Sequence, residues 1–229
     1  MKPLPKSLQL SEMLIREIAS GKLPDGTRLP PEREFADTLG VAVGTLRKAL
    51  ALLEDKALLR RVQGSGNYIQ ARSDIDSVYT FFRLERLEGG GLPTASLLSV
   101  DREPRPLEAT GFVHAHAHRI RRLRYLDEDP IALEEIWLDA RFSDQIEEDA
   151  LSESLYYYYK QALGLIISSA EDRVGLDTVP SWAPPSFACS PGSVSGYIER
   201  QAKSQDGRAA EYSRTWFNPA RARYVMRLK

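Results

Sequence analysis

Basic side chains in the first third of the chain have the spacing and chemistry of a nucleic-acid contact. Arg47 and Lys48 fall outside the apolar stripe of a predicted helix, and Arg60 and Arg61 follow in a segment of strand character. Such cations can neutralise DNA phosphates and release condensed counterions. The alternative is a solvated helix face, the usual fate of scattered Lys and Arg. Turn glycines and paired prolines at fitting positions favour the DNA interpretation.

The residues around these cations predict two short helices and a hairpin. Pro31 suits the first turn of a helix, and Gly40 can end it. Apolar residues recur at i, i+3, i+4 and i+7 over 46–53, which predicts a second helix with one buried face. Segments 58–62 and 67–69 have strand character on either side of a glycine-rich tip. Two helices joined by a tight turn present the second to a major groove, so the sequence predicts a helix-turn-helix with a basic wing.

A second pair of arginines suggests anion binding in the other half of the chain. Arg122 and Arg124 are two residues apart, so on a strand their side chains leave the same face. Two guanidinium groups there can hold a phosphate or carboxylate through charge-assisted hydrogen bonds. The alternative is cross-strand pairing with carboxylates on a sheet surface. Because a charge at the rim or inside a pocket is seldom part of a core, we expect Arg124→Ala to leave the fold nearly intact.

Three histidines and one cysteine could suggest metal or redox chemistry. His114, His116 and His118 alternate, but ligands spaced along one strand cannot all reach one zinc ion at about 2.0 Å. We therefore prefer a histidine row without function and expect no metal site and no cofactor. Cys189 has no second cysteine to pair with, so we expect a small buried residue.

Length and charge indicate two domains. The chain has 229 residues, more than one typical domain needs. Residues 1–70 carry 11 Lys and Arg against 8 Asp and Glu, a net charge of +3, whereas 71–229 carry 20 against 24, a net of −4. Only the first part is biased toward nucleic acid. We expect a DNA-binding domain at 1–70, a linker at 71–77 within the polar stretch 70–77, and a second domain at 78–229. No membrane-spanning run or signal peptide is visible, which predicts a cytoplasmic protein.

The second half has the pattern of an α+β domain. Strand composition marks the segments 94–100, 116–125, 131–138 and 209–217. Helical patterns are expected at 141–150 and 154–163, and partly at 193–202, with a further helix near the N-terminus at 7–20. The tyrosine run 156–159 would surround a helix, so one or two of its side chains at most would line a pocket.

The first seventy residues resemble the winged helix of GntR family bacterial regulators. The motifs are 21–26, 29–36, 45–50 and 64–66. The resemblance implies that Arg33 and Arg47 contact DNA and that the wing backbone enters the minor groove. Ala42-Val43 replaces the Ser-Arg that many members carry before the recognition helix, so affinity is expected to depend more on other contacts. The predicted DNA-binding residues are Arg33, Thr45, Arg47, Lys48, Arg60, Arg61, Gly64 and Gly66.

The second half resembles the UTRA effector domain of the HutC subfamily. Its motifs lie at 120–125, 129–134, 154–156 and 210–213. The resemblance implies a chorismate-lyase-like antiparallel sheet with short helices and a ligand pocket beside it. The expected ligand is a small anion: a sugar phosphate, a phosphonate or a small carboxylic acid. The predicted effector-binding residues are Thr94, Ser96, Arg122, Arg124, Glu134, Ser154, Tyr156 and Glu211.

These expectations combine into a ligand-responsive bacterial transcription factor, a repressor that binds a pseudo-palindromic DNA operator as a homodimer. Two other classes are possible. A constitutive DNA-binding protein with a structural C-terminal domain would show no ligand-induced stabilisation. A lyase-like enzyme would need a nucleophile and base or a metal constellation. The sequence shows neither, and a lyase-like fold alone does not determine chemistry.

Overall fold

A computed structural model describes residues 3–71 and 81–227 of the chain. These residues form two compact units, one centred on Leu4–Arg83 and the other on Leu84–Tyr224, and each is described by itself. Most of the linker predicted at 71–77 lies outside the described residues, so its limits stay a prediction. Within the described ranges no helix has both the length and the apolar composition needed to cross a membrane.

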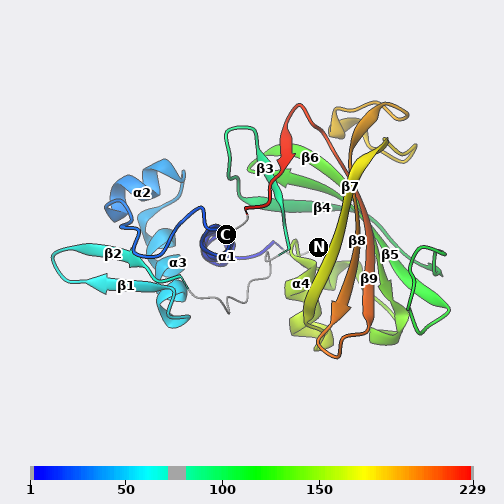
Figure 1. Ribbon diagram of the computed structural model, residues 1–229, viewed down its shortest axis with the longest axis horizontal. Coiled ribbons are helices and arrows are strands. Elements are labelled where there is room, and N and C mark those ends of the chain that lie inside the picture. The colour runs from blue at the N-terminus through cyan, green and yellow to red at the C-terminus, as the bar shows by residue number, and fades with distance from the viewer. Residues whose placement is uncertain (1–2, 72–80, 228–229) are drawn as a thin grey trace. The chain divides into compact units, whose positions relative to one another are not determined.

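The first unit is three helices and a hairpin (Figure 1). Its elements in chain order are α1 (Lys6–Ala19), α2 (Glu32–Thr38), α3 (Val43–Asp55), β1 (Leu59–Val62) and β2 (Gly66–Ile69). The strands pair antiparallel, with Leu59 opposite Ile69. The apolar stripes of α1 and α3 supply the core, where Ile18, Leu46 and Leu53 are fully buried. The predicted winged helix-turn-helix is confirmed.

The start of α3 lacks a side-chain cap. Ala42 occupies the N-cap position with extended backbone angles, and its methyl group accepts no hydrogen bond. By contrast, α2 begins with Glu32 and Glu34 in its first turn, where carboxylates favour the positive end of the helix dipole. Ala42 therefore leaves a first-turn amide of α3 without the partner that Ser or Thr would supply.

Replacing Ala42 with serine is expected to raise the free energy of unfolding by about 1 kcal/mol, because a serine hydroxyl at the N-cap accepts a hydrogen bond from a first-turn amide. Urea denaturation of the full chain measures the change. Ala42→Val serves as the control, since valine adds bulk without an acceptor. Equal stability of the serine variant and the wild-type protein would show that α3 gains nothing from a cap.

The second unit is built on one antiparallel sheet, so the predicted α+β class is confirmed. Its strands lie in the order β4-β5-β6-β9-β8-β7, and a separate two-stranded sheet joins β3 to β10. The strands are β3 (Leu84–Arg86), β4 (Pro93–Pro104), β5 (His116–Leu126), β6 (Asp129–Asp139), β7 (Ile167–Thr178), β8 (Val194–Ser204), β9 (Ala209–Phe217) and β10 (Ala222–Tyr224). Figure 1 shows α4 (Leu155–Tyr158) beside this sheet.

The two faces of the sheet have different coverings. On the helix-side face, Ile120, Ile136 and Leu138 pack with Leu155 and Tyr159 of the α4 region. The opposite, loop-side face carries two apolar clusters beneath irregular segments. Their members are Leu123, Leu133, Val179, Phe187 and Trp216 in one, and Ala109, Phe112, Ala117, Trp137 and Tyr212 in the other. Side chains that alternate along a strand therefore point in turn to the helix-side face and to the loop-side face.

Three predicted elements differ from the structure. The segment expected to be partly helical at 193–202 is strand β8, and β7 has no counterpart among the predicted elements. Residues 141–150 contain only two short 3₁₀ turns, Ala140–Phe142 and Glu148–Ala150. The helix predicted at 154–163 is present as α4 followed by a π-helical turn, Tyr159–Leu163. The strands predicted at 94–100, 116–125, 131–138 and 209–217 are confirmed.

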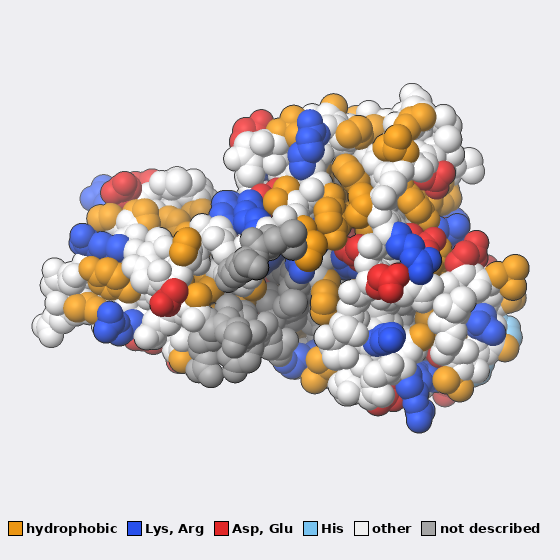
Figure 2. Space-filling model, viewed as in Figure 1, with side chains coloured by type: hydrophobic (Ala, Val, Ile, Leu, Met, Phe, Trp, Pro, Cys, Tyr) orange, Lys and Arg blue, Asp and Glu red, His pale blue; other side chains and the backbone are white. Residues whose placement is uncertain are grey.

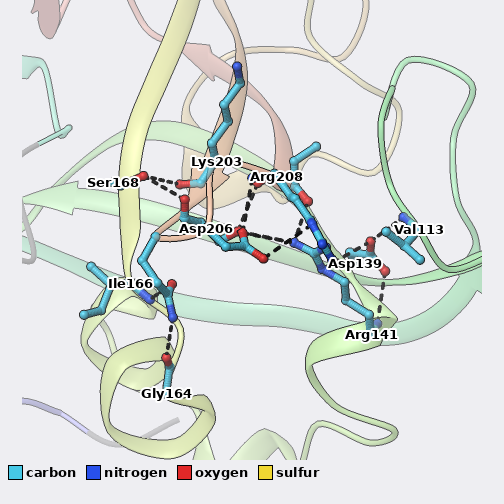
Figure 3. Close-up of polar contacts among 12 residues, drawn as sticks. Val113, Asp139, Arg141, Gly164, Ile166, Ser168, Lys203, Asp206 and Arg208 are labelled. Carbon is cyan, nitrogen blue, oxygen red and sulfur yellow. Dashed lines mark hydrogen bonds and ion pairs between the residues drawn. The ribbon is translucent and has the colours of Figure 1, made fainter.

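The turn between β8 and β9 is tied to neighbouring segments by polar contacts (Figure 3). Arg141 donates to the carbonyl of Ala209 at 3.1 Å and lies 4.0 Å from Asp206. The side chain of Gln205 accepts from the amide of Ile166 and donates to the carbonyl of Gly164, both at 2.9 Å. These bonds fix the chain between the π-helical turn and β7, and thereby the position of the α4 region on the sheet.

Candidate functional sites

The predicted cations of the first unit lie on its surface. Arg33, Arg47, Lys48 and Arg60 are exposed, and Thr45 is partly buried one turn before Lys48. Arg60 and Arg61 are neighbours on β1, so their side chains leave opposite faces of the hairpin. The two wing arginines therefore cannot contact the same phosphate from the same direction.

Glu32 links the recognition helix to the wing. Its Oε2 lies 2.6 Å from Nε of Arg47, and its Oε1 lies 3.5 Å from a terminal nitrogen of Arg61. Arg61 also donates to Glu54 of α3 at 2.8 Å. Two of the predicted DNA-binding arginines are thus held by carboxylates in the free protein. Sequence reasoning singled out the cations but missed these partners, because the pairs join different elements at separations of 7, 15 and 29 positions.

The wing tip has the backbone that its glycines allow. Gly64 and Gly66 have φ values of +74° and +123°, which other residues rarely adopt. Arg28 forms an isolated bridge to Tyr68, and its Nε would lie 3.3 Å from a Cβ at Gly66. A hollow of about 410 Å³ runs between the segment before α2 and the wing, with both Arg28 and Arg61 in its lining. Of the predicted wing residues, Arg61, Gly64 and Gly66 line this hollow, whereas Arg60 is not in its lining.

In the second unit, the predicted arginine pair is brought together with Glu134. Arg122 lies opposite Glu134 in the β5–β6 register, and its terminal nitrogen donates to Glu134 at 2.6 Å. Arg124 approaches the same carboxylate at 3.5 Å. Both arginines also donate to the carbonyl of Glu153, at 3.0 and 3.1 Å. The two guanidinium groups thus converge on one region of the helix-side face.

This cluster is buried, which argues against the expectation that Arg124 is dispensable for folding, because removing one partner of a buried ion pair leaves the other charge uncompensated. Arg122 is 3 % exposed, Arg124 5 % and Glu134 8 %. Burial acts to raise the pKa of Glu134, but the charges of Arg122 and Arg124 outweigh it and hold this pKa below its ordinary value. Cross-strand pairing, the alternative considered from the sequence, is present too, but inside the domain. Among the described residues, nothing accepts a hydrogen bond from the buried Nε of Arg122.

A second buried carboxylate lies on the same face. Glu211 accepts from the hydroxyl of Tyr156 at 3.0 Å and from that of Tyr159 at 2.9 Å. Burial raises the pKa of Glu211 despite these two hydrogen bonds. The pKa values of both tyrosines are also raised well above the ordinary value, by burial and by the nearby carboxylate. Tyr156 was predicted as a site residue, whereas Tyr159 was not.

Arg200 and Asp172 extend this polar cluster and were missed from the sequence. Arg200 donates to both oxygens of Asp172, at 2.6 and 2.7 Å, and Tyr224 donates to the same carboxylate at 2.9 Å. Burial alone would lower the pKa of Arg200, but the bond to Asp172 and the nearby Tyr156 and Glu211 raise it. Alternation along β8 and β7 could have revealed both residues, had these segments been predicted as strands.

Two other predicted effector contacts, Thr94 and Ser96, are placed differently, whereas Ser154 lies on the helix-side face. Thr94 and Ser96 lie on β4, opposite Tyr125 and Leu123 of β5. Their side chains therefore lie on the loop-side face, away from the arginine pair. The Ser96 hydroxyl lies 3.3 Å from that of Tyr125. Ser154 is buried at the start of α4, where its Oγ accepts from the amide of Tyr157. The helix-side face therefore gathers Arg122, Arg124, Glu134, Ser154, Tyr156 and Glu211.

The remaining residues considered for chemistry do not form a site in the described chain. His118 is buried, and its ring lies 2.8 Å from the carbonyl of Ser143, while burial lowers its pKa. The rings of His114 and His116 lie 5.8 Å apart, and no metal-binding group of side chains occurs among residues 3–71 and 81–227. Cys189 is partly buried beside the cluster that contains Phe187.

Replacing Glu211 with glutamine is expected to change how stability depends on pH. The pKa of Glu211 is raised in the folded protein, so its contribution is full below the unfolded value and is lost as pH rises through the folded value. The glutamine variant lacks this loss. We expect its free energy of unfolding, relative to wild type, to rise as pH increases above the ordinary pKa of a glutamate. Urea denaturation at a series of pH values measures this rise, and a difference that stays constant across the series contradicts the assignment.

Comparison with known proteins identifies a family for each of the two units. Residues 6–69 match the family of bacterial regulatory proteins called the gntR family, and residues 89–223 match the UTRA domain. The chain is 53 % identical to the HTH-type transcriptional regulator SmoD of Agrobacterium fabrum, over 99 % of this chain and 97 % of SmoD. It is 26 % identical to MngR of Escherichia coli, the mannosyl-D-glycerate transport/metabolism system repressor, over 92 % of this chain and 90 % of MngR.

A solved structure shows the same fold. The crystal structure of YydK from Bacillus subtilis, described as a possible transcriptional regulator, superposes with a TM-score of 0.55 at 19 % identity. The match covers 99 % of this chain and 100 % of YydK. The two units are therefore found together, in this order, in another solved protein.

Proposed function

This chain belongs to the GntR family of bacterial regulatory proteins and carries a UTRA domain, and from that premise we propose that it is a repressor whose affinity for DNA is set by a small anion. Its relatives are transcriptional regulators and not enzymes. The first unit binds a pseudo-palindromic operator in the cytoplasm as part of a homodimer, with one recognition helix for each half-site. Arg47 reads bases, and the wing cations contact phosphates.

One observation carries the effector proposal. Arg122 and Arg124 converge on the helix-side face, and the buried Nε of Arg122 has no acceptor among the described residues. Beside them, burial raises the pKa of Glu211, and its carboxylate is already bonded to two tyrosine hydroxyls. The converging guanidinium groups suit a phosphate, phosphonate or carboxylate. Tyrosine hydroxyls and the two carboxylates suit the hydroxyl groups of an attached polyol.

The name of one relative fits this ligand class. MngR is the repressor of a mannosyl-D-glycerate system, and glycerate carries a carboxylate. An effector of this kind releases the operator only if it binds the DNA-incompetent state more tightly than the competent one. We therefore propose that the anion favours a placement of the two winged helices that no longer fits both half-sites.

A thermal-shift screen tests the effector proposal. Sugar phosphates, phosphonates and small carboxylic acids are added to the full chain, and a ligand at 100 times its dissociation constant should stabilise it by about 2.7 kcal/mol. Each hit is then titrated into a complex with operator DNA, where release is expected. A constitutive DNA-binding protein with a structural C-terminal domain would instead bind its operator equally well with every compound, and none would raise its melting temperature.

Neutralising Arg60 is expected to flatten the dependence of operator binding on salt. Its side chain is exposed on the wing, and the log–log slope should change by about 0.9 for each DNA phosphate that the wing no longer neutralises. Arg61→Gln should change the slope less, because Glu54 and Glu32 already hold that guanidinium. Fluorescence anisotropy at several salt concentrations gives both slopes. If Arg60→Gln leaves the slope at its wild-type value, this face of the wing does not contact the DNA.

A further inference from the structure

Strand β7 is an edge strand that exposes two large apolar side chains, Val174 and Leu176. The sheet order gives it one hydrogen-bonded neighbour among the described strands, β8. Every residue from 173 to 178 is exposed. The exposed fraction is 52 % for Val174 and 75 % for Leu176, and Val194, opposite Thr178 on β8, is 67 % exposed. Figure 2 shows hydrophobic side chains on the part of the surface where β7 runs in Figure 1. Such an edge can accept another strand.

The other edge of the sheet is interrupted within its length, whereas the irregularity of β7 lies near its start, between Ile167 and Ser169. Strand β4 carries Pro93 and Pro104 at its ends and an irregularity between Leu97 and Ser99. Prolines and bulges are common means of blocking strand addition. From Ser169 to Thr178, in contrast, β7 keeps an unbroken register with β8 and contains no proline. The backbone of β7 is therefore suited to continue the sheet.

The sequence of this edge is complementary to itself. It reads Arg173-Val174-Gly175-Leu176-Asp177. If a second β7 lies antiparallel with the two-fold axis at Gly175, each Val174 faces a Leu176, and each Arg173 faces an Asp177. Cross-strand apolar pairs and opposite charges stabilise a sheet, whereas like charges directly opposite each other destabilise it. A Cβ at Gly175 would meet no atom within 4 Å, so the axis position is open.

We propose that β7 pairs with β7 of a second copy of this chain about Gly175, joining the two six-stranded sheets into one. This inference rests on the proposed homodimer and names its surface. The partner is a second copy because a two-fold interface brings residue i of one copy against residue j of the other, and residue j against residue i. The residue pattern around Gly175 meets this requirement. In the single chain Arg173 lies 3.0 Å from Glu171 and 3.6 Å from Glu199, with 69 % of its side chain exposed. Exposed pairs of this kind are weak and readily exchanged.

The interface also reaches the buried polar cluster through one residue. Asp172 lies on β7 next to Arg173, and both of its oxygens accept from Arg200. Arg200 is near enough to Tyr156 and Glu211 for their charges to raise its pKa. The edge strand is thus connected to the proposed effector pocket by one charged pair.

Charge reversal tests the pairing. In the full-length protein, Arg173→Asp places two aspartates opposite each other, and Asp177→Arg does the same with arginines. Each change acts twice across the axis, so each should weaken dimerisation at least about tenfold in sedimentation equilibrium. The double variant restores opposite charges and should recover the wild-type constant. Arg208→Asp is the matched control, because Arg208 is also 69 % exposed but lies in the β8–β9 turn. Circular dichroism checks that each variant folds.

The outcomes separate the interface from the proposed function. Weakening by both single changes with rescue by the double variant supports the pairing. Unchanged constants in both single variants, or weakening without rescue, overturn the Gly175-centred interface while leaving a homodimer through another surface intact. A wild-type protein that is monomeric at every concentration and binds operator as one copy overturns both the interface and the proposed homodimer.

Discussion

Arg122→Ala is expected to lower the free energy of unfolding by about 3–5 kcal/mol, because it leaves Glu134 buried without its 2.6 Å partner. The same change should abolish effector-induced release of the operator. Since the variant is destabilised, absence of the response alone proves little. Combining Arg122→Met with Glu134→Gln removes both charges and keeps most of the volume. We expect this double variant to regain much of the stability, yet not the response.

Urea denaturation and operator titrations measure the two effects separately. The pKa of Glu134 is lowered in the folded protein, so its stabilising contribution is present above the unfolded value and is lost as pH falls through the folded value. The stability difference between wild type and Arg122→Ala should therefore shrink in acid. A double variant that still releases the operator at wild-type effector concentrations would remove Arg122 from the effector site.

Arg47→Ala is expected to weaken operator binding by about 1–3 kcal/mol and random-sequence binding far less, if the guanidinium reads a base. The companion change is Glu32→Gln. Glu32 holds Arg47 at 2.6 Å and also approaches Arg61, so its replacement removes a negative charge beside the DNA and frees both cations. We expect tighter binding to random DNA and a preference for operator reduced roughly tenfold.

Glu54→Gln is the control for Glu32→Gln, because Glu54 pairs with Arg61, whereas Glu32 pairs with both Arg61 and Arg47. It should tighten random binding slightly and leave the preference for operator intact. Competition between labelled operator and random duplex at fixed salt measures both quantities. An equal weakening on both duplexes in Arg47→Ala would make that residue a phosphate contact.

The winged helix could be predicted because its signals are local. Pro31, Gly40 and the glycines of the wing act on the backbone within a few residues, and the apolar spacing of α3 is regular. Strand β8 could not be predicted, because its Glu, Arg, Gln, Ala and Lys residues favour a helix in isolation. Its pairing with β9 and β7 makes it a strand in the folded domain. Strand β7 is mostly exposed and polar, so it lacks the alternation that marks a half-buried strand.

The site could be predicted only in part for the same reason. Residue spacing correctly placed Arg122 and Arg124 on one face, but spacing says nothing about which neighbouring strand shares that face. Thr94 and Ser96 consequently came to lie on the opposite side, in register with Tyr125 and Leu123. Burial was misjudged too, because the covering α4 region lies some thirty residues further along, as the 31-residue separation of Arg122 and Glu153 shows.

Adjacent carboxylates on β6 serve opposite sides of the sheet. Glu134 pairs with Arg122 on the helix-side face, while Glu135 bonds Arg121 at 2.8 Å and Arg214 on the loop-side face. Because side chains on β6 alternate between the two faces, substitutions at its even positions can change the proposed effector site without touching the network around Glu135 on the other face. Deleting one residue from β6 would instead exchange the two sets at once. The proposed effector site can therefore change by point substitution, whereas a change in the length of β6 would disturb both faces of the sheet at once.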